Sequence, residues 1–220
     1  MLQPATLTFL RQLKRNNNRP WFEAHKDKYL EAKADFEAFV EQVITAYGQT
    51  DTSLAGLEVK DCVFRIYKDV RFSKDKTPYK SNFAAGFNKG GKRVHLPGYY
   101  LHIEPGGNHF CGGGIWMPAA PELKKIRQEI DYNLDEFLGI IREKQFRKLF
   151  GELNTESALS RPPQGYSADN PAVDFLKLRS FIVGSSFSDA EVASPKLLKL
   201  ILQRFTAMKP LIDFLNRAMD

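Results

Sequence analysis

Basic side chains crowd one stretch of the sequence. Between residues 63 and 80 the cations are Arg65, Lys68, Arg71, Lys74, Lys76 and Lys80, and the acidic residues are Asp69 and Asp75. Aromatic residues are interleaved with these charges at Phe64, Tyr67, Phe72 and Tyr79. Cations this close together repel one another unless an anionic ligand or a network of carboxylates neutralises them. The sequence therefore predicts a site in this stretch.

The first charged residues of the stretch could hold an anion. On a strand, Arg65, Tyr67 and Asp69 share one face, which Arg71 joins if the strand continues. A guanidinium offers forked donors to a phosphate or a carboxylate, so one interpretation is an anion clamp. The other is a structural network in which Arg65, Lys68 and Arg71 pair with aspartates and fix the following loop.

A second group of residues could transfer protons. Tyr100, His102 and Glu104 alternate along a predicted strand and therefore share a face, where His102 would act as a general base oriented by Glu104. The other interpretation is a polar pair on a solvent-facing sheet surface. Tyr79, three residues after Lys76, is a candidate acid because a neighbouring ammonium lowers the pKa of a phenol.

These residues support two hypotheses. In the first, the protein binds an anionic small molecule or an acidic peptide, which is gripped by Arg65, Lys68, Arg71, Lys76 and Arg179 and packed by Tyr79, Tyr100 and Trp116. The acidic members of the same ligand-binding set are Asp69, Asp75 and Glu104. In the second, the same place is the active site of an enzyme, with His102 or Asp69 as base and Tyr79 as acid.

Other chemistries lack the sequence patterns that they need. The four histidines and two cysteines have no metal-ligand spacing, so we predict no metal. The glycine-rich pieces 90–92 and 112–116 match neither a Walker loop nor a dinucleotide fingerprint, and we predict no cofactor. Binding of single-stranded nucleic acid is a minor alternative, because basic and aromatic residues interleave but no recognised module is present.

Composition indicates an ordinary globular chain. Its 220 residues, with 43% hydrophobic and 26% charged content, suit a single domain, which we predict over 1–220. No apolar run approaches the roughly 18 residues of a membrane span, and the N-terminus lacks the features of a signal peptide. We therefore expect a cytoplasmic protein without membrane association, in which Cys62 and Cys111 are buried thiols. The net charge of +6 is compatible with an anionic partner.

Hydrophobic periodicity predicts the elements that must position these side chains. A period of 3.6 predicts helices over 5–14, from 20 to 48 and from 119 with an apolar stripe to 141, a further short helix that runs to 150, a short one over 171–178, and a last one from 194. A period of two predicts strands over 62–67, 82–88, 98–104, 109–117 and 179–185. Three glycines within 109–117 suggest a bulge or the close approach of another backbone or a ligand. The fold class is therefore α+β, a largely antiparallel sheet flanked by N-terminal and C-terminal helices.

The stretch around residues 65–79 resembles the signature of an uncharacterised bacterial family, a domain of unknown function. That signature is R-x-x-R-D-x-R-F, three residues, D or N, K, two residues and Y, and here its positions hold Arg65, Lys68, Asp69, Arg71, Phe72, Asp75, Lys76 and Tyr79. Lys68 departs from the second arginine of the signature, which puts a bidentate contact there in doubt. The similarity covers nearly the whole chain, including TPYKSNFAAGF, PGYYLHIEPGG and GGGIWMP. The resemblance implies a site and a self-contained module, and it names no reaction.

Overall fold

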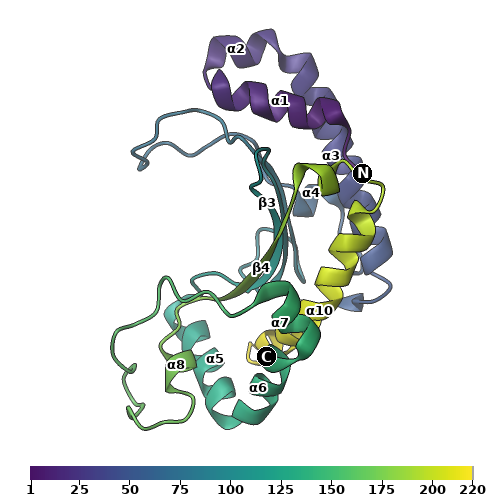
Figure 1. Ribbon diagram of the computed structural model, residues 1–220. Helices are drawn as coiled ribbons and strands as arrows, with labels where there is room; N and C mark the ends of the chain where they lie inside the picture. The colour runs from purple at the N-terminus through teal and green to yellow at the C-terminus, as the bar shows by residue number, and fades with distance from the viewer. Residues whose placement is uncertain (220) are drawn as a thin grey trace. The chain divides into compact units, whose positions relative to one another are not determined.

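The computed structural model describes residues 1–219, which group into two compact units (Figure 1). Unit 1 consists of 1–94, 100–111 and 186–202, and unit 2 of 95–99, 112–185 and 203–219. Neither unit is a continuous stretch of chain. The prediction of a single domain over 1–220 stays a prediction.

Unit 1 begins with three helices, α1 (Pro4–Arg15), α2 (Arg19–Ala24) and α3 (Lys26–Tyr47). The side chain of Asn18 starts α2 by accepting a hydrogen bond from the backbone N–H of Trp21 at 3.0 Å. The predicted continuous helix from residue 20 to 48 is interrupted at His25. The ring of His25 stacks on Trp21 and contacts the Trp21 carbonyl at 2.8 Å, so the side chain occupies an acceptor of the helix.

The strand predicted over 62–67 is wrong. The chain instead forms a 3-10 turn (Thr52–Leu54) and the short helix α4 (Val59–Cys62), where Asp61 accepts a hydrogen bond from the N–H of Glu58. Residues 63–68 then run irregularly and pair with 78–85 through the isolated bridges Val63–Ala85 and Tyr67–Tyr79. The helix α4 takes up Cys62, the first residue of the predicted strand, and the residues after it form only these two bridges and no continuous ladder.

Four antiparallel strands form one sheet in the order β1-β2-β3-β4. They are β1 (Phe83–Phe87), β2 (Gly98–Ile103), β3 (His109–Ile115) and β4 (Phe181–Phe187). Strands β2, β3 and β4 contribute residues to both units. The alternation predicted for β2 is confirmed, because Tyr99, Leu101 and Ile103 are buried whereas Tyr100 and His102 are half-buried.

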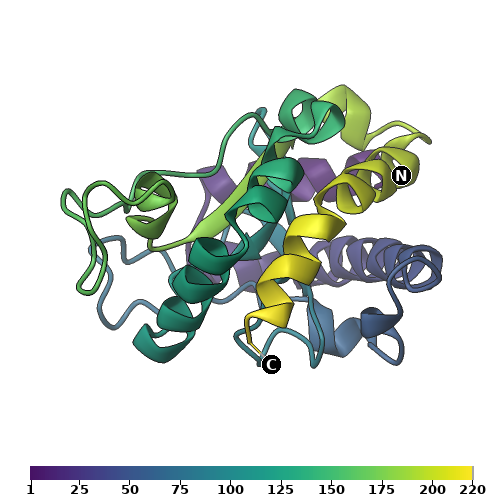
Figure 2. The same ribbon diagram turned by 90° about the horizontal axis from the view of Figure 1, so that it is seen from below.

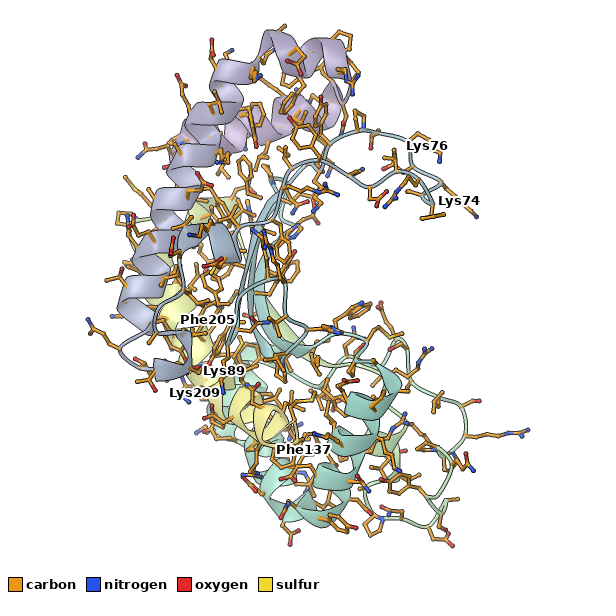
Figure 3. All side chains as sticks on the ribbon, turned by 180° about the vertical axis from the view of Figure 1, so that it is seen from behind. Lys74, Lys76, Lys89, Phe137, Phe205 and Lys209 are labelled. Atoms are coloured by element: carbon orange, nitrogen blue, oxygen red, sulfur yellow. The ribbon has the colours of Figure 1, made fainter. Side chains whose placement is uncertain are left out.

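Unit 2 is mainly helical. It contains α5 (Ala120–Tyr132), α6 (Leu134–Arg142), α7 (Lys144–Phe150), α8 (Val173–Leu176) and most of α10 (Leu197–Arg217), whereas α9 (Asp189–Val192) belongs to unit 1. Figure 2 shows α5 beside the C-terminal half of α10, where Arg217 contacts Glu129 at 2.8 Å. Phe137 and Phe205, labelled in Figure 3, are fully buried and pack against Phe214 and Tyr99 respectively.

The secondary structure of residues 1–219 confirms the α+β class, with helices at both ends of the chain and the sheet between them. Across that part of the chain, no helix is both long and apolar enough to cross a bilayer. The described residues also contain no group of three or more His, Cys, Asp or Glu side chains that could hold a metal ion. Cys62 and Cys111 are both buried as thiols.

Candidate functional site

Ion pairs within the loop over 68–77 occupy much of the predicted anion clamp. The guanidinium of Arg71 donates to Asp69 twice, from Nε at 3.0 Å and from Nη2 at 2.6 Å. The ammonium of Lys68 donates to Asp75 at 2.7 Å and to the hydroxyl of Thr77 at 2.6 Å. These contacts hold the pKa values of Asp69 and Asp75 below their usual range. The network interpretation therefore describes these four charged residues best.

The loop over 68–77 projects away from the strands of unit 1 (Figures 1 and 3). Figure 3 labels two of its lysines, of which Lys76 donates to the carbonyl of Val70 at 2.9 Å. Phe72 is 95% exposed, and the guanidinium of Arg71 lies 5.8 Å from the centroid of its ring. Internal contacts thus brace the loop without covering its aromatic residue.

Tyr79 lies in the core of unit 1. Its ring stacks on Phe22 with centroids 4.0 Å apart and is 2% exposed. Its backbone is held by the side chain of Asn17, which accepts from its N–H at 3.1 Å and donates to its carbonyl at 2.8 Å. Burial is also the main cause that raises the pKa of Tyr79. Tyr79 is thus a protonated core residue of unit 1, held away from the surface on which a ligand could bind.

Arg65 and Lys80 differ from the other cations of this stretch because no carboxylate pairs with them. Within residues 1–219, neither the guanidinium of Arg65 nor the ammonium of Lys80 forms a hydrogen bond or an ion pair. Lys80 is half-buried, and its Nζ lies 5.7 Å from the centroid of the Phe64 ring. Burial, and then the charge of Arg65, lower the pKa of Lys80. These two cations are therefore available to a ligand.

The structure brings His102 and Glu104 together as predicted. Nε2 of His102 lies 3.3 Å from a carboxylate oxygen of Glu104, and the two side chains are 16% and 20% exposed. Glu104 also accepts hydrogen bonds from Lys14 at 2.8 Å and from the hydroxyl of Ser81 at 3.1 Å. Burial tends to raise the pKa of Glu104, but these donors outweigh it and lower the pKa.

The other ring nitrogen of His102 faces two donors. Its Nδ1 lies 3.4 Å from the amide nitrogen of Asn82 and 3.4 Å from the hydroxyl of Tyr100. When the neutral ring of His102 carries its proton on Nε2, that nitrogen donates to Glu104 and Nδ1 accepts a hydrogen bond. Both ring nitrogens then have a partner. Stacking on Phe110, at 4.9 Å between centroids, fixes the ring plane. Nδ1 is thus the basic atom of the group.

Burial sets the protonation state of this group. It is the largest cause that lowers the pKa of His102, and the positive charge of a protonated His109 adds to it, whereas Glu104 opposes it. Burial also raises the pKa of Tyr100. His102 and Tyr100 are therefore both neutral at pH 7, with a proton on the phenol and a lone pair on Nδ1.

Ring contacts join the unpaired cations to the histidine. The ring of Phe64 lies 6.1 Å from that of Tyr100, whose ring in turn lies 6.2 Å from His102. We define the His102 face as this continuous surface of unit 1, made up of Phe64, Arg65, Lys80, Asn82, Tyr100, His102, Glu104 and Phe110. It combines cations without counter-ions, aromatic rings and a histidine–carboxylate pair on one surface.

Two predicted ligand-binding residues, Trp116 and Arg179, belong to unit 2, whereas the other nine belong to unit 1. Trp116 is 53% exposed and its carbonyl is contacted by Nε2 of His95 at 2.7 Å. Arg179 is exposed and forms no hydrogen bond or ion pair with the described residues.

Sequence reasoning missed several residues of the His102 face. Phe110 could have been found, because it occupies the outward position of β3 next to the outward residues of β2. Lys14 comes from α1 and reaches Glu104 across 90 positions of sequence, so no local pattern indicates it. Lys80 was counted among the cations of the stretch, but nothing in the sequence separates it from the cations that have partners.

Comparison with known proteins identifies the family and nothing beyond it. Residues 5–214 match the family described as a conserved hypothetical protein (DUF2461), and the chain belongs to that family. The predicted resemblance to a domain of unknown function is thereby confirmed. No curated protein and no solved structure matches the chain.

Proposed function

We propose that the His102 face binds a small anionic ligand bearing a phosphate or a carboxylate. The observation that carries this proposal is the pair Arg65 and Lys80, two cations without a carboxylate partner on one aromatic surface. A half-buried ammonium without a counter-ion is unfavourable, because burial removes its hydration and nothing replaces it. A bound anion would supply the missing charge.

The contrast with neighbouring cations supports this assignment. Arg71 and Lys68, in the same stretch, are neutralised by Asp69 and Asp75. No described carboxylate lies within ion-pair distance of Arg65 or Lys80, although the charge of Arg65 contributes to the lowered pKa of Asp69. Lys14 pairs with Glu104 at 2.8 Å, which reduces the repulsion that this carboxylate would exert on an incoming anion.

The aromatic residues of the face support a ligand with a flat or apolar body. Phe64, Tyr100 and Phe110 form a chain of ring contacts, with 5.7 Å between the centroids of Tyr100 and Phe110. Such rings bury the body of a ligand while the cations bind its charged end. We propose an anionic small molecule as the ligand, with an acidic peptide as the larger alternative, and we propose that it is met in the cytoplasm.

We expect Lys80→Met to weaken binding of the anion about ten- to hundredfold, because a charge-assisted hydrogen bond contributes about 1.5–3 kcal/mol. Isothermal titration calorimetry with phosphorylated metabolites, nucleotides and dicarboxylates measures the affinity. Lys74→Met is the matched control, since Lys74 is an exposed lysine of the projecting loop and the substitution removes the same charge. Equal losses in the two variants, or the absence of any anionic ligand for the wild-type protein, would refute the proposal.

A second candidate function is proton-transfer catalysis at the same face. The observation that favours it is the geometry of His102, with Glu104 on Nε2 and the Tyr100 hydroxyl 3.4 Å from Nδ1. In that arrangement Glu104 orients the ring, and Nδ1 accepts a proton from a ligand or from Tyr100. An enzyme would lose turnover in His102→Gln but keep its ligand affinity, whereas a binding protein has no turnover to lose.

We expect His102 to titrate below pH 6.5, because burial disfavours its protonated form. Glu104→Gln removes the carboxylate that stabilises the protonated ring, so it should lower the pKa further. NMR titration of the histidine side chains measures both values, and Glu41→Gln, an exposed position on α3, is the control. The pKa of His102 is lower in the folded protein than in the unfolded chain, so the unfolded chain binds the proton more readily. The free energy of unfolding therefore falls as the pH drops from about 6.5, the unfolded pKa, toward the folded pKa. A pKa at or above 6.5 would contradict the burial argument.

A further inference from the structure

Two arginines of unit 2 lie side by side along the backbone of residues 178–180. Arg127, on α5, donates from Nη2 to the carbonyl of Leu178 at 3.2 Å, and Arg179 is the next residue of that segment. The Nε of Arg127 is buried and has no hydrogen-bond partner. A buried N–H without an acceptor is costly in a folded protein, and no described residue accepts from this atom.

Neither arginine has a counter-ion among residues 1–219. Arg217, in the same unit, shows the opposite arrangement, because it pairs with Glu129 at 2.8 Å and with Glu136 at 2.6 Å. Burial is the main cause that lowers the pKa of Arg127; Tyr166 opposes it, and the charge of Arg179 adds to it, so the two guanidiniums lie within electrostatic range of each other. Two adjacent guanidiniums without a carboxylate are the arrangement that binds phosphate in many proteins.

An exposed indole lies next to this segment. The hydroxyl of Ser180, which is fully buried, accepts a hydrogen bond from the backbone N–H of Met117 at 3.0 Å. This bond links Met117, which follows Trp116, to Ser180, which follows Arg179. Met117 has a φ of 45°, and it is the only residue other than glycine with a positive φ in the described chain. Such a conformation is unfavourable for a side chain this large and often marks a functional position.

We propose that Arg127, Arg179 and Trp116 form a second binding site, built from unit 2 alone, for a phosphate monoester attached to a planar ring. The forked donors of the two guanidiniums bind the phosphate oxygens. The exposed indole of Trp116 stacks on the planar ring. This second site does not depend on the function proposed for the His102 face. Arg179 and Trp116, which the sequence placed in one ligand-binding set with Arg65 and Tyr100, bind a different ligand in this proposal.

Trp116 itself reports on this site. The chain has two tryptophans, so Trp21→Phe makes Trp116 the sole indole. AMP and phenyl phosphate are titrated into that variant, and we expect each to change the Trp116 fluorescence in a saturable way. Inorganic phosphate should compete, and adenosine, which lacks the phosphate, should bind at least tenfold more weakly. If Trp21→Phe does not fold, calorimetry with the wild-type protein replaces fluorescence.

Arginine variants decide the assignment. Arg179→Gln should weaken binding of both phosphate esters at least tenfold, and Arg127→Lys, which keeps the charge but loses the fork, should also weaken it. Arg142→Gln is the matched control, since it removes one exposed guanidinium from α6 of the same unit. The inference is overturned if neither ester binds, if Arg142→Gln matches Arg179→Gln, or if Lys80→Met abolishes the signal. The last result would place the binding at the His102 face instead.

Discussion

Replacing Gly114 by alanine is expected to destabilise the protein by more than about 3 kcal/mol, which is at the upper end of single substitutions. Gly114 has a φ of 120°, a conformation that residues with a side chain rarely adopt. A Cβ built at this position lies 1.8 Å from the carbonyl oxygen of Phe181. That oxygen belongs to the backbone of β4, so it cannot move without breaking the pairing of β3 with β4. Urea denaturation followed by circular dichroism measures the loss.

Gly139→Ala is the matched control for Gly114→Ala. Gly139 lies inside α6, and a Cβ added there meets no atom within 4 Å. Alanine favours a helix over glycine by about 1 kcal/mol, so this variant should be as stable as the wild-type protein or more stable. A Gly114→Ala protein within about 1 kcal/mol of the wild type would show that β3 and β4 do not approach each other this closely.

Asp189→Ala is expected to cost about 2–3 kcal/mol, because it leaves a buried donor without an acceptor. The carboxylate accepts from Nε2 of His109 at 2.9 Å and from the backbone N–H groups of Gly106 and Gly107, each at 3.2 Å. It also pairs with Arg11 on α1 at 3.3 Å. His109 is fully buried, and no other described residue accepts from its Nε2. Thermal and urea denaturation at pH 7 measure the effect.

Asp174→Ala controls for the loss of an aspartate. Its side chain is 87% exposed and its pair with Lys177 spans 3.4 Å, so this variant should stay within about 0.5 kcal/mol of the wild type. Hydrogen bonds from Gly107, Gly106 and His109 outweigh burial and lower the pKa of Asp189. The contribution of Asp189 to the free energy of unfolding is therefore complete above its pKa in the unfolded chain, about 3.9. It is lost as the pH falls through the lower pKa that Asp189 has in the folded protein. An Asp189→Ala penalty that is the same at pH 7 and pH 3 would contradict this account.

The structure changes how the charged signature of the family is interpreted. Asp69, Asp75, Arg71 and Lys68 brace a projecting loop, whereas the cation that best fits a ligand role is Lys80, just outside the signature. Arg71→Ala would therefore test the loop rather than the proposed ligand site. The variants that test ligand binding are Lys80→Met at the His102 face and Arg179→Gln at the site in unit 2, whereas His102→Gln tests turnover.

Local patterns determined a large part of the fold from the sequence. A strand alternates with a period of two whatever its neighbours are, so the shared face of Tyr100, His102 and Glu104 followed from their spacing. Helix signals are equally local, and Asn18 and the Ser188–Glu191 capping box act within one turn. The strand predicted over 62–67 was wrong, because α4 includes Cys62 and the residues after it pair with the chain only at two isolated bridges.

Tertiary structure alone decided which charged groups have partners. Lys14 reaches Glu104 across 90 positions, and Asp189 reaches His109 across 80, so no window of sequence contains both members of either pair. The sequence places Arg71 and Lys80 in the same basic stretch, yet one is neutralised and the other is not. That difference arises because an ion pair requires two side chains within about 4 Å, and only the folded backbone brings distant residues that close.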